Sequence, residues 1–472
     1  MFILASFIRS YALNDKVEVM QLTKRDRYAD LLVWKNQENK KPLIIRGARQ
    51  VGKTTLIKQF SKEYDYFIHL NLEKSKDASL FKQNLEASEL IDILFLRNNI
   101  NSKNIDNTLL FIDEIQEEPR AIAQLRYFYE DHPGLSIIGA GSLLEHKMKD
   151  ISNFPVGRVE FLYLFPFNFH EFLIANNKKT LASAILDKDW KVSLHELALE
   201  WFNRYAIIGG MPEVVTNYAV TNQLSSLPRI YESIWTTYKE DILKYAKNTS
   251  QNRIIQFLVD TAPLYADQRI KFQNFGNSNY KSREVSEAFK QLNDAKIIQL
   301  IYPCTKVDFP IIPSLRKSPR LQFLDTGILN FCLSIQDQLI QLNDLSDAYR
   351  GAIIPHLITQ ELISKNTNAY QLPHFWVRDK KQSSAEVDLL ICINELLIPI
   401  EIKSGKKGTL KSLHEFIDLS EHPYAVRLYA GKYSVEEGKT KRGKIYKLLN
   451  LPYYLGLKLE EEITNFIKNN PF

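Results

Sequence analysis

The sequence is short of cysteine, of strong net charge and of membrane-spanning runs. Its three cysteines, Cys304, Cys332 and Cys392, are isolated and show no metal-ligand spacing. Isolated cysteines argue against a disulfide framework and fit a reducing cytoplasm. The apolar stretch 1–13 carries one arginine and is too short for a membrane span, with a signal anchor as the alternative. We therefore expect a cytoplasmic protein without a membrane partner, and no internal repeat is evident.

The charge balance is only mildly basic. There are 61 lysines and arginines against 55 acidic residues, a formal net charge of +6. Such an excess permits nucleic acid as a partner without requiring it. A content of 45% hydrophobic and 25% charged residues is ordinary for globular proteins, and 472 residues are too many for one core. We therefore expect several domains.

The first chemical motif follows a short apolar run at 43–46, which is typical of a buried strand. Gly47 and Gly52 allow several backbone N–H groups to point at a phosphate, and a helix that begins near Lys53 adds its positive end. Lys53 would reach the β- and γ-phosphates, and the Thr54 hydroxyl would ligate Mg²⁺. An ordinary glycine-rich turn is the alternative. The predicted nucleotide-binding loop comprises Gly47, Ala48, Arg49, Gln50, Val51, Gly52, Lys53, Thr54 and Thr55.

Two further apolar runs predict the rest of a nucleotide site. The run at 108–112 ends in Asp113 and Glu114, and the run at 135–141 ends in Ser142. Continuous apolar strands are typical of a parallel sheet, whose carboxyl ends form the ligand site. Asp113 would hold Mg²⁺, Glu114 would polarise an attacking water, and Ser142 would sense the γ-phosphate. Residues that merely end a strand are the alternative.

One arginine is a candidate for stabilising the transition-state charge. Arg158 lies close to the end of the predicted nucleotide domain, and it would act in its own subunit or across a homo-oligomer interface. Arg126 is a weaker rival, and a solvated surface arginine is the alternative. His69 is expected to be a strand histidine without chemistry.

These motifs, together with several other short stretches, resemble the motifs of a known protein family. The loop at 47–55, Phe-Ile-Asp-Glu-Ile-Gln at 111–116, Gly-Ser at 141–142, Pro-Val-Gly-Arg at 155–158 and Pro-Phe-Asn-Phe-His-Glu-Phe at 166–172 resemble the AAA+-type ATPases of bacteria and archaea that carry a C-terminal domain of unknown function. The stretches 209–215 and 323–329 are similar to two other signatures of that family. The resemblance implies an α/β fold with ATP and Mg²⁺ as cofactors, and ATP hydrolysis as the activity.

The domain order follows from the change of pattern along the chain. We expect a non-structural extension at 1–20, with both Met1 and Met20 as candidate start residues. A P-loop ATPase domain at 21–175 and a helical lid at 176–247 come next, followed by a winged-helix-like domain at 248–335 and a nuclease-like domain at 336–472. In the lid, the charged run at 239–241 is expected to be a solvated helix face.

The pattern at 248–335 resembles a winged helix. A helix at 282–292 is followed by a strand at 296–302, a basic turn at 316–320 and a second strand. This arrangement favours DNA binding, with a fold used only for packing or protein contact as the alternative. The candidate phosphate contacts are Lys281, Arg283 and Lys290 on the helix and Arg316, Lys317 and Arg320 on the wing.

A second constellation lies on two predicted strands near the C-terminus. Glu401 and Lys403 alternate on one strand and therefore share a face, and Asp388 on the neighbouring strand can meet them there. Two carboxylates that hold a metal and a lysine beside them are similar to the PD-(D/E)XK nuclease superfamily. Charged strand-edge residues and a fold retained only for binding are the alternatives. Three outlying candidates are Glu361 as an extra ligand and Lys406 and Lys407 as contacts to a nucleic-acid backbone.

Two functions from different classes fit these patterns. In the first, Mg-dependent ATP hydrolysis moves the lid and controls a DNA-binding or DNA-cleaving C-terminal domain. In the second, the protein is a nucleotide-gated switch that recognises a protein partner and has no nuclease activity. The sequence leaves the oligomeric state open.

Overall fold

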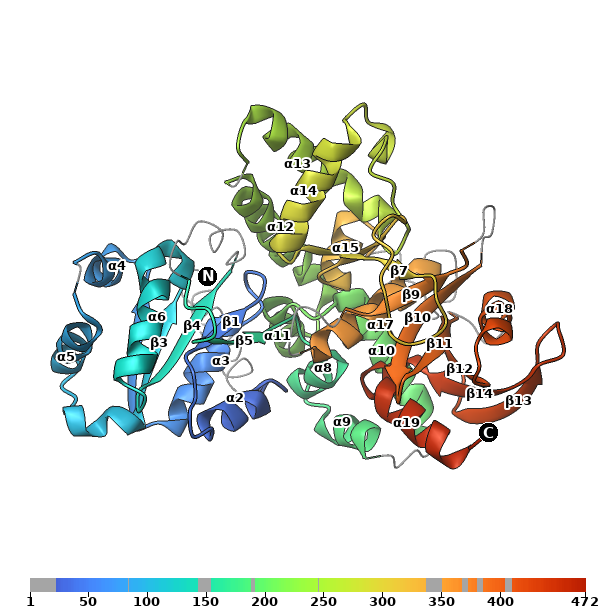
Figure 1. Cartoon of the computed structure of the whole chain (residues 1–472), viewed down its shortest axis with the longest axis horizontal. Coiled ribbons are helices and arrows are strands. Elements are labelled where there is room, and N and C mark those ends of the chain that lie inside the picture. The colour runs from blue at the N-terminus through green and yellow to red at the C-terminus, as the bar shows by residue number, and fades with distance from the viewer. Residues whose placement is uncertain are drawn as a thin grey trace, which may run out of the picture.

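The computed structural model describes residues 23–83, 85–142, 154–187, 192–244, 246–336, 350–366, 372–379, 385–403 and 410–472 (Figure 1). The expected extension at 1–20 and the lysines at 406 and 407 lie outside these residues. No helix in the described ranges is long and apolar enough to cross a membrane.

A five-stranded parallel sheet forms the N-terminal part of the chain. Its order is β2-β3-β4-β1-β5. The strands are β1 (Leu43–Arg46), β2 (Tyr66–Asn71), β3 (Thr108–Asp113), β4 (Ser136–Gly141) and β5 (Glu160–Tyr163). The helices around it are α2 (Tyr28–Lys35), α3 (Lys53–Phe60), α4 (Ser75–Lys82), α5 (Ala87–Arg97) and α6 (Pro119–Asp131).

Both faces of this sheet are covered, which explains why its central strands are continuous apolar runs. Every residue of β3 is buried, and successive side chains of β3 enter different cores. Leu109 and Phe111 belong to the core shared with α2 and α3, whereas Leu110 and Ile112 belong to the core on the side of α5 and α6. The expected α/β class with a parallel P-loop sheet is thus confirmed.

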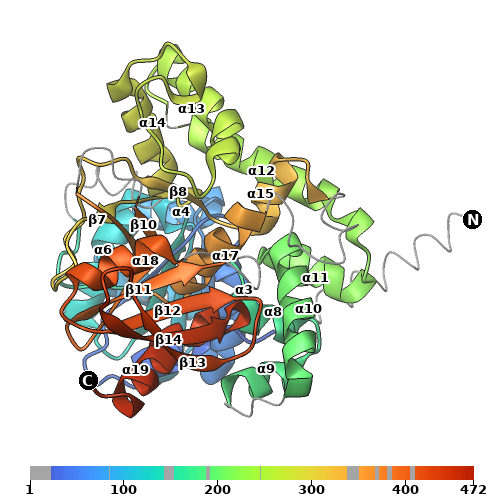
Figure 2. The ribbon, with the colours of Figure 1, turned by 90° about the vertical axis from the view of Figure 1, so that its right-hand side faces the viewer.

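Helices occupy the middle of the molecule. They are α8 (Phe169–Ala175), α9 (Lys179–Leu186), α10 (Val192–Ile208), α11 (Pro212–Thr221) and α12 (Pro228–Leu243). Next come α13 (Thr249–Thr261), α14 (Ser282–Asp294), β6 (Ile298–Ile301), β8 (Arg320–Phe323) and α15 (Thr326–Cys332), with β6 and β8 antiparallel. Figures 1 and 2 both show α13 and α14 projecting from the top of the molecule.

The C-terminal part is built on a mixed sheet of seven strands. Its order is β13-β14-β12-β11-β10-β9-β7. The strands are β7 (Pro303–Cys304), β9 (His374–Val377), β10 (Glu386–Ile393), β11 (Leu396–Ile402), β12 (Tyr424–Tyr429), β13 (Ser434–Lys439) and β14 (Ile445–Pro452). The accompanying helices are α17 (Arg350–Lys365), α18 (Lys411–Leu419) and α19 (Leu459–Asn469). Because β7 pairs with β9, the segment between β6 and β8 adds a strand to the C-terminal sheet.

A buried carboxylate joins the two family-like stretches at 209–215 and 323–329. Asp325 caps α15, where one carboxylate oxygen accepts the N–H of Ile328 at 3.0 Å. The other oxygen accepts the N–H of Gly210 at 2.5 Å, in the turn between α10 and α11. Burial raises the pKa of Asp325 to about 6. This carboxylate therefore fixes the helices of the middle region to one another.

The turn at Gly209 and the start of α15 approach each other closely, and a substitution at Gly209 tests whether this approach is required. Gly209 has a φ of +72°, and a Cβ there would lie 2.4 Å from Asp325 Oδ1 and 2.5 Å from the N atom of Gly327. We expect Gly209→Ala to lower the free energy of unfolding by about 3 kcal/mol or more, through the clash added to the strained φ. Thermal or urea unfolding measures the loss.

The matched control is Gly157→Ala. Gly157 has a φ of +73°, but a Cβ there meets nothing within 4 Å. This variant should lose only about 1–2 kcal/mol, the cost of a left-handed residue with a side chain. Equal losses in the two variants would show that the approach of Asp325 is unimportant.

Candidate functional site

The nucleotide-binding loop lies between β1 and α3, as its spacing predicts. Gly52 precedes α3 with a φ of +94°, a conformation that favours glycine. At the other end of the loop, a Cβ on Gly47 would lie 2.2 Å from the backbone O atom of Leu164, so only glycine fits there. The Lys53 ammonium donates across the loop to the carbonyl oxygens of Gly47, at 3.0 Å, and Ala48, at 2.9 Å. The lysine is thereby held inside the curve of the loop.

The predicted Mg²⁺ ligands point at each other. The Thr54 hydroxyl donates to Asp113 Oδ2 at 2.8 Å. Burial opposes the charge of Asp113, but contacts with His69 and Thr54 hold the pKa of this carboxyl below its usual value. His69 Nε2 lies 3.6 Å from Asp113 Oδ2, so this histidine lies beside the site, although the sequence predicted no role for it. An ionised carboxylate beside a hydroxyl at a helix N-terminus fits a phosphate-bound Mg²⁺.

Glu114 and Ser142 lie at neighbouring strand ends. Glu114 has a φ of 50°, an uncommon value for a residue with a side chain, directly after β3. Its Oε2 accepts the Gln116 side-chain amide at 2.6 Å. Ser142 is buried and follows β4, which pairs with both β3 and β1. Both residues are thus at the carboxyl edge of the sheet, next to the loop.

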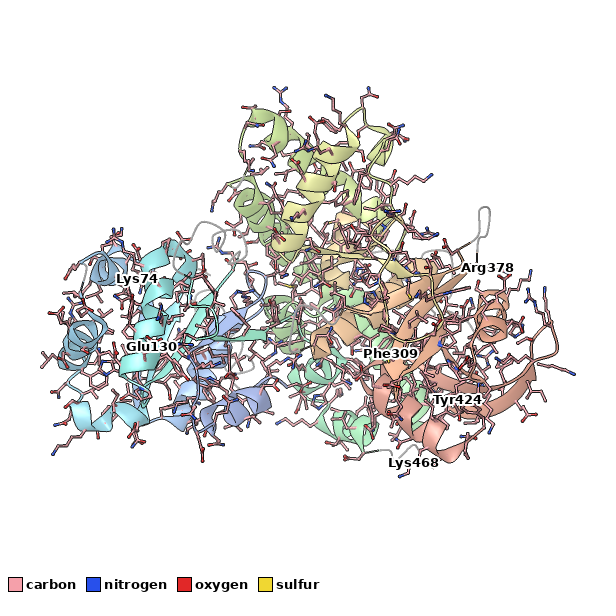
Figure 3. All side chains as sticks on the ribbon, viewed as in Figure 1. Lys74, Glu130, Phe309, Arg378, Tyr424 and Lys468 are labelled. Atoms are coloured by element: carbon pink, nitrogen blue, oxygen red, sulfur yellow. The ribbon has the colours of Figure 1, made fainter. Side chains whose placement is uncertain are left out.

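Arg158 and Arg126 share one carboxylate on α6. Glu130 accepts Arg158 Nε at 2.9 Å and Arg126 Nε at 3.1 Å. Figure 3 labels Glu130 on the ATPase side of the molecule. Arg158 precedes β5, whose first residue pairs with Leu43 at the start of β1, so it lies at the edge of the sheet opposite the loop. Its side chain is 44% exposed, and it does not reach the nucleotide site of its own subunit.

A residue of α12 contacts the loop directly, and here one sequence expectation is wrong. The run 239–241 was expected to be solvated, yet Asp241 is buried and accepts two hydrogen bonds from Arg49, at 2.8 and 2.6 Å. One turn earlier on α12, the Tyr238 hydroxyl donates to the backbone O atom of Arg49 at 2.6 Å. Only Glu240 of the acidic pair faces solvent. The helical region is therefore fastened to the nucleotide-binding loop.

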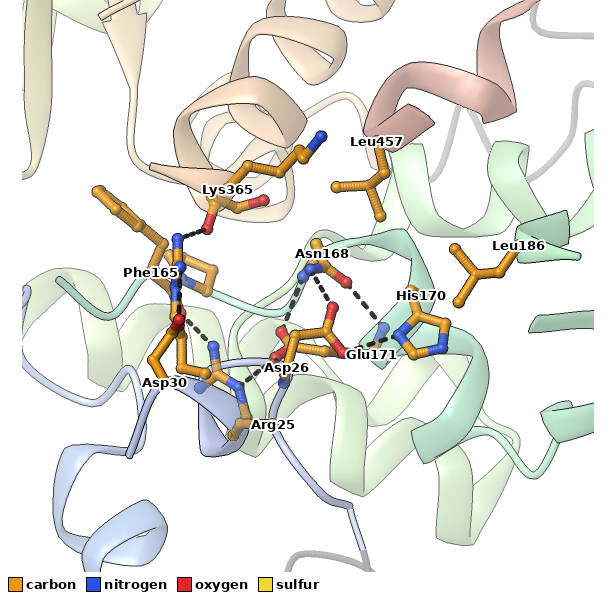
Figure 4. Close-up of a pocket in the computed structure, with 13 residues that line it drawn as sticks. Arg25, Asp26, Asp30, Phe165, Asn168, His170, Glu171, Leu186, Lys365 and Leu457 are labelled. Atoms are coloured by element: carbon orange, nitrogen blue, oxygen red, sulfur yellow. Dashed lines mark hydrogen bonds and ion pairs between the residues drawn. The ribbon is translucent and has the colours of Figure 1, made fainter. Parts of the chain in front are cut away.

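Arg25 supports the loop from another side. Its guanidinium donates to the O atom of Val51 at 2.8 Å and pairs with Glu171 at 2.9 Å. No motif signals this arginine, because its partners are distant in sequence. It also lines a cavity of about 360 Å³ between the ATPase sheet, α8 and the end of α17 (Figure 4). The charged side chains there are largely paired, as His170 with Asp26 at 2.8 Å, so we assign the cavity no ligand.

The structure brings together the three residues of the C-terminal constellation. The Asp388 carboxylate on β10 accepts the Ile402 N–H at 2.7 Å, and Lys403 forms an ion pair with Glu401 on β11. Burial and the neighbouring Asp388 charge raise the pKa of Glu401 to about 7. Glu386, at the start of β10, is close enough to raise it further, although no sequence pattern pointed to that residue.

Two residues predicted for other roles are not where the sequence placed them. Arg320 was expected on a DNA-binding wing, but it is buried and paired with Glu386, because β8 lies against the C-terminal sheet. Glu361 was expected as an extra metal ligand, but it faces away from the constellation. It accepts the Phe169 N–H at 3.0 Å and the Tyr205 hydroxyl at 2.8 Å. In the described ranges, no group of three His, Cys, Asp or Glu side chains has the geometry to hold a metal.

The other basic candidates differ in exposure. Lys281, Lys290 and Arg316 are exposed, and so is Arg283, which pairs with Glu287 on the same helix at 2.9 Å. Lys317 is paired with Asp379 at 2.8 Å. The exposed cations on and beside α14 are thus Lys281 just before the helix and Arg283 and Lys290 on it, with the acidic Glu287 between the last two.

Comparison with known families agrees with the geometry of the first site. Residues 39–173 match an AAA domain. With the parallel sheet and its loop, this match supports an AAA-type P-loop ATPase domain in that range. Residues 199–339 and 350–454 match two families described as domains of unknown function, DUF8612 and DUF4143. No curated protein matches the sequence.

Three solved structures are similar at low identity. The Walker-type ATPase PABY2304 of Pyrococcus abyssi is 15% identical over 66% of this chain and 95% of its own, with a TM-score of 0.41. The ORC1 protein of Aeropyrum pernix in complex with DNA is 11% identical over 67% and 94%, with a TM-score of 0.29. The RuvB Holliday junction branch migration motor of Thermotoga maritima is 15% identical over 61% and 88%, with a TM-score of 0.27.

The contact between α12 and the loop can be tested by removing Asp241. We expect Asp241→Ala to lower the free energy of unfolding by about 1–3 kcal/mol, because Arg49 loses a partner in a largely buried contact. Glu240→Ala, one residue away on the exposed face, should change stability by no more than about 0.5 kcal/mol. Chemical unfolding of both variants measures these changes in the free energy of unfolding. If both behave alike, the contact with Arg49 contributes nothing measurable.

Proposed function

We propose that this protein binds and hydrolyses ATP with Mg²⁺, and that nucleotide state controls its C-terminal domain through the helical region. The observation that carries the proposal is the contact of Thr54 with Asp113, beside a lysine held in the loop. These groups come from two separate motifs, and their convergence supports a complete nucleotide site.

The residues of the loop fit the charge of a nucleotide triphosphate. Backbone N–H groups of 47–55, the start of α3 and the Lys53 ammonium would bind the phosphate oxygens. Mg²⁺ would neutralise charge on the β- and γ-phosphates, with Thr54 and Asp113 as its protein ligands. Ser142, at the end of β4, would contact the γ-phosphate.

Hydrolysis also requires a group that orients water. Glu114 follows Asp113 directly, and its amide donates to Asp113 Oδ1 at 3.1 Å, so the two carboxylates have fixed relative positions. Glu114 would accept a hydrogen bond from the attacking water, while Gln116 holds its carboxylate in place. Arg158, exposed at the surface, would stabilise transition-state charge from a neighbouring copy of the chain.

Two variants separate ATP binding from hydrolysis. Lys53→Ala should abolish ATP binding, because the loop loses its only ammonium. Glu114→Gln should still bind ATP but lose at least about 100-fold in turnover, since the amide cannot accept a proton. Binding of a fluorescent ATP analogue and phosphate release measure the two effects. The control is Glu117→Gln, which replaces an exposed carboxylate three residues further along the chain and should keep full turnover. Full turnover by Glu114→Gln would overturn the assignment of Glu114.

Coupling to the rest of the chain would begin at Arg49. This loop residue contacts α12 through Asp241 and Tyr238, so a nucleotide that moves the loop also pulls on the lid. The Asp325 junction then links the turn before α11 to α15. From α15, the Thr326 N–H donates to Gln360 of α17 at 2.9 Å. This chain of contacts is the route by which ATP would control the C-terminal domain.

DNA is the partner that the basic surface of α14 favours. The Arg283 side chain is 89% exposed, and Lys290 on the same helix and Lys281 just before it are also exposed. Exposed lysines and arginines on a projecting helix can contact phosphates without disrupting the fold. A protein partner recognised in a nucleotide-gated manner is the second candidate, and it needs none of these three charges.

Salt dependence distinguishes the two partners. Replacing Lys281, Arg283 and Lys290 together by alanine should weaken binding to a DNA duplex and lower the slope of log K against log salt by about 0.9 for each phosphate that the protein no longer neutralises. Fluorescence anisotropy at several salt concentrations measures the slope. A double variant of the exposed acidic residues Glu232 and Glu240 on α12 is the control for surface substitution. An unchanged slope in the basic triple variant would favour the protein partner.

A further inference from the structure

The C-terminal constellation is part of a larger cluster of charges. Its carboxylates are Asp267, Glu386, Asp388 and Glu401, and its cations are Arg269, Arg320 and Lys403. Asp267 lies before β8, in the segment with α13 and α14, and the other carboxylates lie on β10 and β11. The cluster therefore spans the contact between that segment and the C-terminal sheet.

Arg320 occupies the inside of this cluster. It is only 4% exposed, and its guanidinium forms an ion pair with Glu386 and donates to the backbone O atom of Asp388 at 2.9 Å. Asp267 Oδ1 lies 3.8 Å from the same group. The guanidinium carbon is also 4.4 Å from the centroid of the Phe375 ring. A planar group held by carboxylates, a carbonyl and a ring has a single fixed orientation.

The Glu401 carboxylate of this cluster is not fully satisfied. Glu401 is 6% exposed, and its Oε2 has no hydrogen-bond partner, while its other oxygen is paired with Lys403. Burial and neighbouring charges raise the pKa values of both Asp388 and Glu401. Buried carboxylates with an open oxygen attract an additional cation, and the positive charge of Arg320 opposes the entry of one.

As arranged, the cluster does not fit a divalent metal. A nuclease-like metal centre would need the carboxylates to face a position free of protein cations. Here Arg320 is paired with Glu386 beside Asp388, and Lys403 is paired with Glu401. Glu361 is turned away on α17. We propose that Arg320 is the resident counter-ion of this cluster, and that it competes with a divalent cation for the carboxylates. The C-terminal site then takes a metal only when β8 moves away from β10. The cause of any movement of β8 depends on the proposed function, whereas the competition between Arg320 and the cation does not.

Binding of Mn²⁺ tests the competition without any enzymatic readout. The background is Asp113→Asn, which removes the protein carboxylate at the nucleotide site. In this background, the Arg320→Gln variant should bind one Mn²⁺ with an affinity at least about tenfold higher than that of the protein that keeps Arg320. The reason is that the opposing positive charge is gone. Titration calorimetry without nucleotide measures it, and adding Glu401→Gln should abolish the gain.

The matched control is Arg269→Gln. Arg269 pairs with the same Glu386 at 3.6 Å but is 37% exposed, so its loss should leave Mn²⁺ affinity unchanged. Two results would overturn the proposal. The first is tight Mn²⁺ binding by the protein that keeps Arg320, if Glu401→Gln abolishes that binding. The second is an Arg320→Gln variant that folds but gains no Mn²⁺ binding. If Arg320→Gln does not fold, Arg320→Lys decides. A lysine keeps the positive charge but lacks the forked hydrogen-bond donors of the guanidinium, so the affinity for Mn²⁺ should rise by about threefold. No rise in affinity would overturn the proposal.

Because none of these variants changes the lid, a failure here would leave the ATPase proposal untouched. Equally, loss of ATP turnover in Lys53→Ala says nothing about Arg320. The two proposals therefore fail separately.

Discussion

The buried carboxylate of Asp325 is the interaction on which the arrangement of the molecule depends. It satisfies backbone N–H groups in a turn and in a helix that lie more than one hundred residues apart in sequence. Without it, these donors would be buried and unpaired, which is unfavourable. The same turn reaches the nucleotide-binding loop, since a Cβ on Gly52 would lie 3.7 Å from Pro212. This carboxylate thus joins α15 to the turn that lies against the nucleotide-binding loop.

The nucleotide site could be predicted because its parts are local in sequence. A strand, a glycine-rich turn and a helix place Lys53 and Thr54 within one short segment, and the rule for parallel strands brings Asp113 to the same edge. In the C-terminal sheet, the hairpin of β10 and β11 follows similarly from two strands joined by a tight turn. Within each segment, neighbours in sequence are neighbours in space, and only the step to Asp113 needs the rule for parallel strands.

The wrong expectations share another cause. Asp241 and Arg320 both stand in charged runs that are typical of solvated surface, yet both are buried. Their partners are far away, because Arg49 precedes Asp241 by 192 residues and Glu386 follows Arg320 by 66. Glu361 was misplaced for the same reason, as Tyr205 precedes it by 156 residues. Contacts between domains decide these side chains, and no local pattern encodes such contacts.

These buried charges also limit how the domains can move. Arg320 lies where separate parts of the chain meet and is only 4% exposed, so a small separation from Glu386 would leave its charge without that partner and without water. Arg49, which is partly exposed and also pairs with Glu73, resists separation from Asp241 less strongly. Intermediate positions are therefore unfavourable, and the parts either stay docked or separate far enough for solvent to enter. The proposed nucleotide-driven movement would therefore proceed between discrete states. In such a mechanism the ion pairs set which states exist more than how stable each one is.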